Sequence, residues 1–320
     1  MKKLLLLTFL LISFVGFSQD ADETEVVKEG WTRGGNASIL FSQAAFNNEW
    51  TGGGVSNISG NFSLTYDINY NKGGLVWDNA LLAEYGLTKL KDDDFARKTN
   101  DRIVLNSIVG KQLKETNWYY SFYLNFKTQM DSGFEDTENP LLDDNGDPII
   151  IDGAQLFETN RVKTTHFFSP AYLQTGPGLL WKKSDNLKVN ISPAAAKFIF
   201  VHDEFTDVGT DQDAIDAFNE AGGYFGVQAN ETVRFEFGAA IEAYAKFNLM
   251  ENIVFENFVN LYSNYLEDPQ NIDIDYTANV IFTVNDWITA NITFQAIYDD
   301  NAVKGFQIRE TLGIGVAHSF

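Results

Sequence analysis

The chain has 320 residues, a formal net charge of -21 at pH 7, 14% aromatic residues and no cysteine. The lack of cysteine excludes disulfides and thiolate metal sites, and it disfavours a lipid-bearing cysteine anchor. The acidic balance argues against contact with nucleic acid phosphates, so we expect no nucleic acid partner.

The first 19 residues have the pattern of a secretory signal peptide. Lys2 and Lys3 precede an apolar run at 4–17, and small or polar residues follow up to Gln19. That run is shorter than the roughly 20 residues that a membrane-spanning helix needs, which disfavours an uncleaved anchor. We therefore predict cleavage near Gln19, followed by a short periplasmic segment at 20–35.

Beyond this segment the dominant pattern is alternation with a period of two. In residues 58–70, every even position is apolar or glycine and every odd position is polar. Such alternation predicts a strand with one face toward lipid and the other toward water. Similar segments are expected near 36–43, 56–70, 75–88, 102–113, 118–129, 166–181, 187–202, 233–248, 253–263, 272–284, 287–298 and 306–320.

The connections between these strands alternate in length. Short turns near 71–74, 114–117, 182–186, 249–252 and 285–286 alternate with longer loops near 44–55, 89–101, 130–165, 203–232, 264–271 and 299–305. Bacterial outer-membrane barrels show this alternation, with the short turns in the periplasm. An open sheet edge would leave unpaired backbone groups in lipid, so the sheet must close.

We therefore predict an all-β membrane protein. Residues 36–320 are expected to form a closed antiparallel transmembrane β-barrel of about 12 strands in the lipid bilayer of the outer membrane, with periplasmic termini. Pro170, Pro177 and Pro193 weaken the prediction for 166–202, because each removes a backbone donor and favours a bulge. Counts of ten or fourteen strands stay open.

Aromatic residues mark the ends of the predicted strands. Trp77, Trp118, Trp181 and Trp287 all fall at periplasmic strand ends, where they predict an aromatic girdle at the headgroup level. The final strand ends in Phe320, and a terminal aromatic of this kind resembles the signal that the barrel-assembly machinery recognises. We expect that machinery to be a partner.

Several short motifs resemble a known family. They are Gly30-Trp31-Thr32-Arg33-Gly34-Gly35, Phe41-Ser42-Gln43, Asn48-Glu49-Trp50, Gly52-Gly53-Gly54, Trp77-Asp78-Asn79 and Tyr85-Gly86. Together they are similar to the opening of the Bacteroidota domain-of-unknown-function 3078 family of predicted outer-membrane proteins. The resemblance implies the fold and the location, and it implies no activity or catalytic residues.

Alternation also predicts which charged side chains face the lumen. They are Asp67, Asp78, Glu84, Arg102, Lys127, Arg234, Glu236, Glu242, Lys246, Glu256, Asp273, Asp275 and Arg309. With both signs present, the charges either close a narrow lumen as an ion-pair network or line a water-filled pore. In a pore, the excess of carboxylates would favour cations over anions, and small solutes or divalent cations are the partners that we expect.

Catalytic and cofactor chemistry find little support. The three histidines, His166, His202 and His318, do not occur in the His-x-Ser arrangement of the twelve-stranded barrel phospholipase, so we expect no enzyme and no cofactor. The acidic loop at 141–148 has Leu141 where a calcium loop needs aspartate, and it is better explained as a hairpin turn at Asn145-Gly146. We predict no metal site, and a short helix at 214–219.

Two functions remain from this pattern. The first is a narrow pore or channel for small solutes. The alternative is a surface interaction protein, in which the loops at 130–165 and 203–232 bind a partner and the barrel is plugged.

Overall fold

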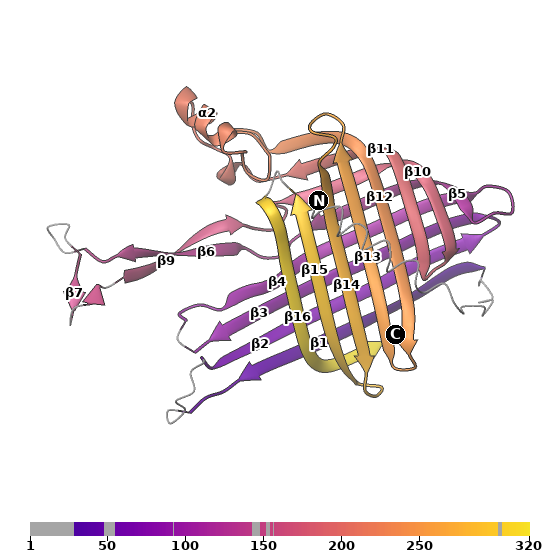
Figure 1. Cartoon of the computed structure of the whole chain (residues 1–320), viewed down its shortest axis with the longest axis horizontal. Coiled ribbons are helices and arrows are strands. Elements are labelled where there is room, and N and C mark those ends of the chain that lie inside the picture. Colours follow the sequence, from indigo (N-terminus) through magenta and orange to yellow (C-terminus); the bar gives the residue numbers. More distant parts are fainter. Residues whose placement is uncertain are drawn as a thin grey trace.

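Twelve long strands close into one antiparallel barrel (Figure 1). The computed structural model describes residues 29–47, 55–91, 93–142, 148–151, 154–155, 157–299 and 303–320, so the predicted signal peptide lies outside the described residues. The barrel strands are β1 (Gly30–Ala44), β2 (Asn57–Lys72), β3 (Leu75–Leu90), β4 (Arg97–Gln112), β5 (Trp118–Thr128), β10 (Ala171–Ser184), β11 (Leu187–Phe200), β12 (Val233–Met250), β13 (Ile253–Asn264), β14 (Ile272–Thr283), β15 (Ile288–Asp299) and β16 (Val303–Ser319). All twelve predicted strands are present, which confirms the predicted fold class.

The first strand begins earlier than the sequence suggested. Strand β1 starts at Gly30 instead of 36, and it pairs with β2 in continuous register from Gly30 opposite Asn71. Gly34 and Gly35 interrupt the alternation of apolar and polar residues, so the sequence pattern did not predict a strand at 30–35. Gly35 is needed there, because a Cβ at this position would lie 2.7 Å from the Thr65 carbonyl oxygen. Residues 30–35 therefore belong to the barrel.

The barrel closes between β1 and β16. Residues 36–41 of β1 pair with residues 314–319 of β16, a shorter seam than the one between β1 and β2. Phe320 extends this seam, since its N–H donates to the Gly35 carbonyl at 3.1 Å and its own carbonyl accepts from the Gly35 N–H at 3.0 Å. Its ring stacks on Tyr66 at 5.9 Å.

One of the prolines produces an expected bulge. The register of β10 against β11 shifts where residues 175–179 of β10 face residues 191–196 of β11, so the extra residue lies on β11, whereas β10 pairs with β5 without a shift at Pro177. The register of β11 against β12 shifts between Ser192 and Ala195, around Pro193. Because one extra residue reverses the alternation of side chains, the second half of β11 faces the opposite way from a simple extrapolation.

The outward face of the barrel is apolar. Large side chains such as Phe122, Phe235, Ile308 and Leu312 are widely exposed, with Leu312 at 66%. A soluble monomer rarely exposes so continuous an apolar surface, whereas a lipid-facing barrel requires one. Among the described residues, no helix has the length and apolar character needed to cross a bilayer.

The two ends of the barrel differ. The end with short turns, at 73–74, 113–117, 185–186, 251–252 and 284–287, is here called the short-hairpin end; it also holds Gly30 and Phe320. The opposite, long-loop end carries two projections (Figure 1). The first projection, here called the arm (133–165), consists of β6 (Gly133–Pro140) paired with β9 (Phe157–Thr165). It also contains a second, short pair, β7 (Ile150–Ile151) with β8 (Ala154–Gln155).

The second projection, the lobe (201–232), contains the 3-10 helix η1 (Asp203–Phe205) and the helix α2 (Gln212–Glu220). Helix α2 confirms the short helix predicted at 214–219. The turn predicted at Asn145-Gly146 lies outside the described residues. A bridge between Leu142 and Pro148 flanks it.

Candidate functional site

Charged side chains cross the lumen near the short-hairpin end. Both carboxylate oxygens of Asp78 on β3 accept from the Lys182 ammonium on β10 at 2.8 Å. Lys188 on β11 donates to the same carboxylate at 3.1 Å. Strands β3 and β10 are separated by β4 and β5 in the sheet, so these bonds span the lumen. Asp78 is 5% exposed, and buried charges of this kind depend on one another.

A second set of charges crosses the lumen nearer the long-loop end. Lys127 on β5 donates to Asp275 on β14 at 2.9 Å, although four strands lie between β5 and β14 in the sheet order. The Gln295 amide donates to the other Asp275 oxygen at 3.0 Å, and Arg309 donates to the Gln295 carbonyl oxygen at 2.9 Å. Glu84 and Arg102 form an ion pair beside them.

A third set centres on a buried lysine. The Lys197 ammonium lies 2.9 Å from Asp273 and 3.3 Å from Glu236, which is itself 2.9 Å from Arg234. Lys197 also lies over the ring of Tyr262, 4.9 Å from its centroid. These contacts join strands β11, β12, β13 and β14 across the inner wall.

Aromatic side chains fill the lumen beside the Lys197 set. Tyr123 on β5 and Tyr262 on β13 pack with Ala195 and Ala240, and Ile108 covers them; we call this group the waist. Tyr123 and Tyr262 are 1% and 3% exposed. Within the described part of the chain, neither hydroxyl has a hydrogen-bond partner. Side-chain volume, and not only charge, therefore closes the lumen here.

Most of the charged residues predicted to face the lumen form ion pairs. Among the described residues, every predicted lumen residue except Asp67 and Glu242 takes part in an ion pair. These pairs include Lys246 with Glu256 at 3.0 Å. Glu242 is half-buried, whereas Asp67 is exposed. Water therefore reaches Asp67 on the inner wall of β2, near the short-hairpin end.

Sequence reasoning missed three inward cations, Lys182, Lys188 and Lys197. Lys182 fell in the turn predicted at 182–186, and Lys197 follows the bulge at Pro193, which reverses the alternation; Lys188 precedes that bulge on β11. The positive charges of these three lysines offset much of the carboxylate excess among the predicted lumen residues. The preference of a pore for cations, which was expected from that excess, therefore no longer follows.

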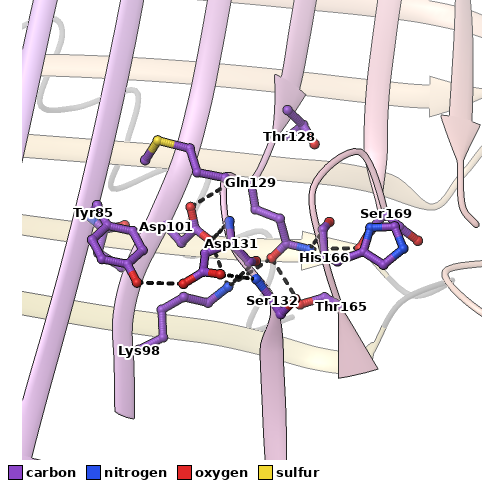
Figure 2. Close-up of polar contacts among 12 residues, drawn as sticks. Tyr85, Lys98, Asp101, Thr128, Gln129, Asp131, Ser132, Thr165, His166 and Ser169 are labelled. Atoms are coloured by element: carbon purple, nitrogen blue, oxygen red, sulfur yellow. Dashed lines mark hydrogen bonds and ion pairs between the residues drawn. The ribbon is translucent and has the colours of Figure 1, made fainter. Parts of the chain in front are cut away.

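Polar contacts fix the base of the arm on the rim of the barrel (Figure 2). The Gln129 amide donates to the carbonyl oxygens of His166 at 3.1 Å and Ser169 at 2.8 Å, and its own carbonyl accepts from Thr165 at 3.1 Å. On the neighbouring strand β4, the Asp101 carboxylate accepts from the N–H of Met130 at 2.7 Å. The arm is thus tied to the barrel wall by both of its strands.

Asp131, in the loop at 129–132 that leads into the arm, contacts two other strands. The Tyr85 hydroxyl donates to its carboxylate at 2.7 Å, and the Lys98 ammonium donates to its carbonyl oxygen at 2.9 Å (Figure 2). The Tyr85 hydrogen bond lowers the pKa of the Asp131 carboxyl. These contacts extend the anchor of the arm to β3 and β4.

The lobe is attached beside the arm. The Ser169 hydroxyl accepts from the His202 N–H at 2.9 Å, and the Thr206 hydroxyl donates to the Glu231 carbonyl at 2.7 Å. The Tyr224 ring stacks on Phe205 at 4.9 Å, and burial raises the pKa of Tyr224 to about 12. The lobe is therefore an ordered structure at the long-loop end.

The three histidines divide between the two ends. His166 and His202 come together at the long-loop end, with ring centroids 5.0 Å apart. His318 lies at the short-hairpin end and stacks on Trp287 at 5.8 Å. Ser169, which bridges to His166, is fully buried, and its hydroxyl accepts from the His202 backbone N–H, so it does not form a serine–histidine nucleophile pair.

The four predicted girdle tryptophans lie where strands meet the short-hairpin end. Trp77, Trp118 and Trp287 are exposed, and Trp181 is half-buried. Trp31 joins them, 5.7 Å from Trp77 in β3, and was missed because it precedes the predicted start of the first strand. The level of these rings supports the predicted girdle.

The comparisons with known proteins point to a family without an assigned activity. The model of the family described as "Protein of unknown function (DUF3078)" matches residues 41–134. This match supports the resemblance carried by the motifs in the first part of the chain. No curated protein matches the chain.

Among solved structures, the chain is similar to the translocator domain of the autotransporter NalP from Neisseria meningitidis, at 9% identity and a TM-score of 0.39, covering 98% of this chain and 96% of that one. It is also similar to an outer membrane channel from Pseudomonas putida F1, at 11% identity and a TM-score of 0.37, covering 94% and 99%. The toluene transporter TbuX from Ralstonia pickettii follows at 10% identity and a TM-score of 0.29, covering 91% and 89%. Scores this low do not discriminate among functions.

Proposed function

We propose that this chain is an outer-membrane β-barrel that is closed at rest and serves as a scaffold for the arm and the lobe, which bind a partner outside the cell. The observation that carries the proposal is the set of lumen-crossing contacts, above all Lys127 with Asp275 and Lys182 with Asp78. The Lys182–Asp78 pair is buried and the Lys127–Asp275 pair is half-buried, and charges paired in this way across a narrow lumen leave little room for a permanent aqueous path. With the short-hairpin end in the periplasm, the arm and the lobe face outward.

The surface of the arm is suited to recognition. Phe134, Phe157 and Val162 are exposed on its two strands, and Glu135 and Glu138 are exposed on β6. By the register, Phe134, Phe157 and Glu138 share one face of the arm, where Arg161 lies 4.4 Å from the Phe134 ring centroid, and Val162 shares the other face with Glu135. Exposed apolar side chains beside a carboxylate on each face favour a partner that offers apolar and basic groups together. Because the base of the arm is fixed by hydrogen bonds, binding there would cost less conformational entropy than binding by an unanchored loop.

A narrow solute pore is the second candidate, and one observation favours it. Asp67 faces the lumen from β2 and is exposed to water, so part of the lumen near the short-hairpin end is wet. A pore would require the waist and the crossing ion pairs to open. The unpartnered hydroxyls of Tyr123 and Tyr262 would then become available to a passing solute.

Shortening the arm tests the scaffold. Thr137 on β6 lies opposite Asn160 on β9, so residues 137–160 can be replaced by a short glycine turn while the ion pair between Asp136 and Arg161 is kept. We expect the shortened protein to fold into the same heat-modifiable barrel in the outer membrane. Protease added to whole cells should cleave the arm of the full-length protein and leave the barrel strands intact. An arm that is cut only after cells are opened, or a barrel that fails without the arm, would contradict the proposal.

A further inference from the structure

His166, His202 and Glu204 form a compact cluster at the long-loop end, between the base of the arm and the lobe. One ligand atom from each of them lies within 4.8 Å of the other two. His166 Nε2 lies 2.8 Å from Glu204 Oε1, and His202 Nδ1 lies 3.9 Å from the same oxygen. Two imidazoles and one carboxylate are a ligand set that Zn²⁺ and similar divalent transition metals prefer.

We propose that this cluster binds one divalent transition metal ion of the Zn²⁺ class and thereby clips the lobe to the base of the arm. The site is separate from partner recognition by the arm and from the lumen. The histidines come from the loop before β10 and the loop after β11, which are adjacent because β10 and β11 form one hairpin. A metal ion there would join two segments that are otherwise linked by hydrogen bonds.

The His166 ring is held in the tautomer that a metal requires. Its Nδ1 lies 2.6 Å from the Phe167 carbonyl oxygen. A carbonyl only accepts, so Nδ1 donates to it, and Nε2 is the nitrogen that a metal would take in place of a proton shared with Glu204. That nitrogen points to Glu204. Metal-binding histidines commonly make such a second hydrogen bond through their other nitrogen.

The backbone holds both histidines in place. Ser169 exchanges two backbone hydrogen bonds with His166, at 3.0 and 2.9 Å, and its hydroxyl accepts from the His202 N–H at 2.9 Å. Ser169 is fully buried. Both ligand-bearing segments are therefore tied to one residue, which fixes the distance between them before any ion arrives.

Glu204 can bind a metal without losing its present ion pair. Its Oε2 lies 2.6 Å from the Lys163 ammonium on β9, whereas Oε1 faces the histidines. A metal would take Oε1, and Lys163 would keep Oε2. The ligand atoms around one Zn²⁺ lie about 3–3.5 Å apart. His202 Nδ1 accepts from the Glu204 N–H at 3.2 Å and lies 2.8 Å from Asp203 Oδ1, so metal binding would replace these contacts. The side chain is 56% exposed, so its ring can turn toward that spacing.

Metal titration of the untagged protein, refolded in detergent, tests the proposal. Zn²⁺ binding is measured by calorimetry, and Co²⁺ binding by its visible absorption. We expect one Zn²⁺ per chain for the wild type, and affinity lower by at least about tenfold in His166→Gln and His202→Gln. The matched control is His318→Gln, which removes the one histidine at the other end and should bind as the wild type does. Ca²⁺ should not compete, because it prefers oxygen ligands.

A further variant separates a metal site from an ion pair. Lys163→Met removes the cation that shares Glu204, so we expect Zn²⁺ to bind at least as tightly as before, whereas Glu204→Gln should weaken it. Unheated gel mobility checks that each variant is folded. A wild type that binds no Zn²⁺ saturably, or binding that survives both His166→Gln and His202→Gln, would overturn the site. Neither result bears on whether the lumen is closed.

Discussion

Replacing Asp78 by asparagine is expected to lower the free energy of unfolding of the barrel by about 3–5 kcal/mol, because it leaves the charges of Lys182 and Lys188 without their buried partner. The carboxylate lies 2.8 Å from the first ammonium and 3.1 Å from the second, and the Asp78 side chain is itself only 5% exposed. Asparagine keeps the size of the side chain, so the change isolates the charge. Denaturant unfolding in lipid vesicles, followed by the loss of the fast-migrating folded band, measures the effect.

Asp185 provides a matched control for this substitution. It also lies 2.7 Å from Lys182, but its side chain is 63% exposed. Exposed ion pairs contribute about 0–1 kcal/mol, so Asp185→Asn should barely change unfolding. If Asp78→Asn costs no more than Asp185→Asn, the lumen at this level is hydrated and its charges do not close it.

Removing the aromatic waist is expected to open the barrel. Tyr123→Ala combined with Tyr262→Ala deletes the two rings that fill the lumen beside Lys197, and small cations and anions should then pass. Single-channel recording of the refolded double variant should show steady current steps. Each truncation of a buried aromatic costs about 3–5 kcal/mol, so the unheated gel must first show a folded fraction.

Two controls accompany the double variant. Tyr123→Phe with Tyr262→Phe keeps the volume of the waist and should stay silent; it should also be stable, because neither hydroxyl has a hydrogen-bond partner in the described part of the chain. Tyr120→Ala removes a ring of the same strand that faces lipid, 64% exposed, and should stay silent as well. A folded alanine double variant without current would show that the waist is not what blocks the lumen.

Most of the fold was predictable because each strand carries its own signal. Alternation such as that at 58–70 depends only on which face meets lipid. The alternation of short and long connections predicted which strand ends lie at the same end of the barrel. The start of β1 was not predictable, because Gly34 and Gly35 serve the contact with Phe320, which lies at the other end of the chain.

The sequence predicted which charged residues face the lumen, but not which of them form ion pairs with one another. The partner of Lys127 is Asp275, with four strands between them in the sheet order, and that choice depends on the stagger of the whole barrel, which no local pattern records. Lys197 was missed because the bulge at Pro193 reverses the alternation behind it.

The histidine cluster, in contrast, had a signal that could have been used. The predicted strands 166–181 and 187–202 form one hairpin, and its open ends bring residues 166 and 202 together. Two histidines at equivalent positions on neighbouring strands then predict a pair. The contribution of Glu204 depends on the turn of η1, which the sequence pattern did not define.

The most direct test of the central claim is the single-channel conductance of the full-length, unmodified protein in a planar bilayer. A barrel whose lumen is crossed by Lys127–Asp275 and Lys182–Asp78 and filled at Tyr123 and Tyr262 should insert, as shown by its heat-modifiable mobility, and remain silent. Steady, ion-selective steps from the unmodified protein would contradict the closed scaffold and establish the solute pore instead.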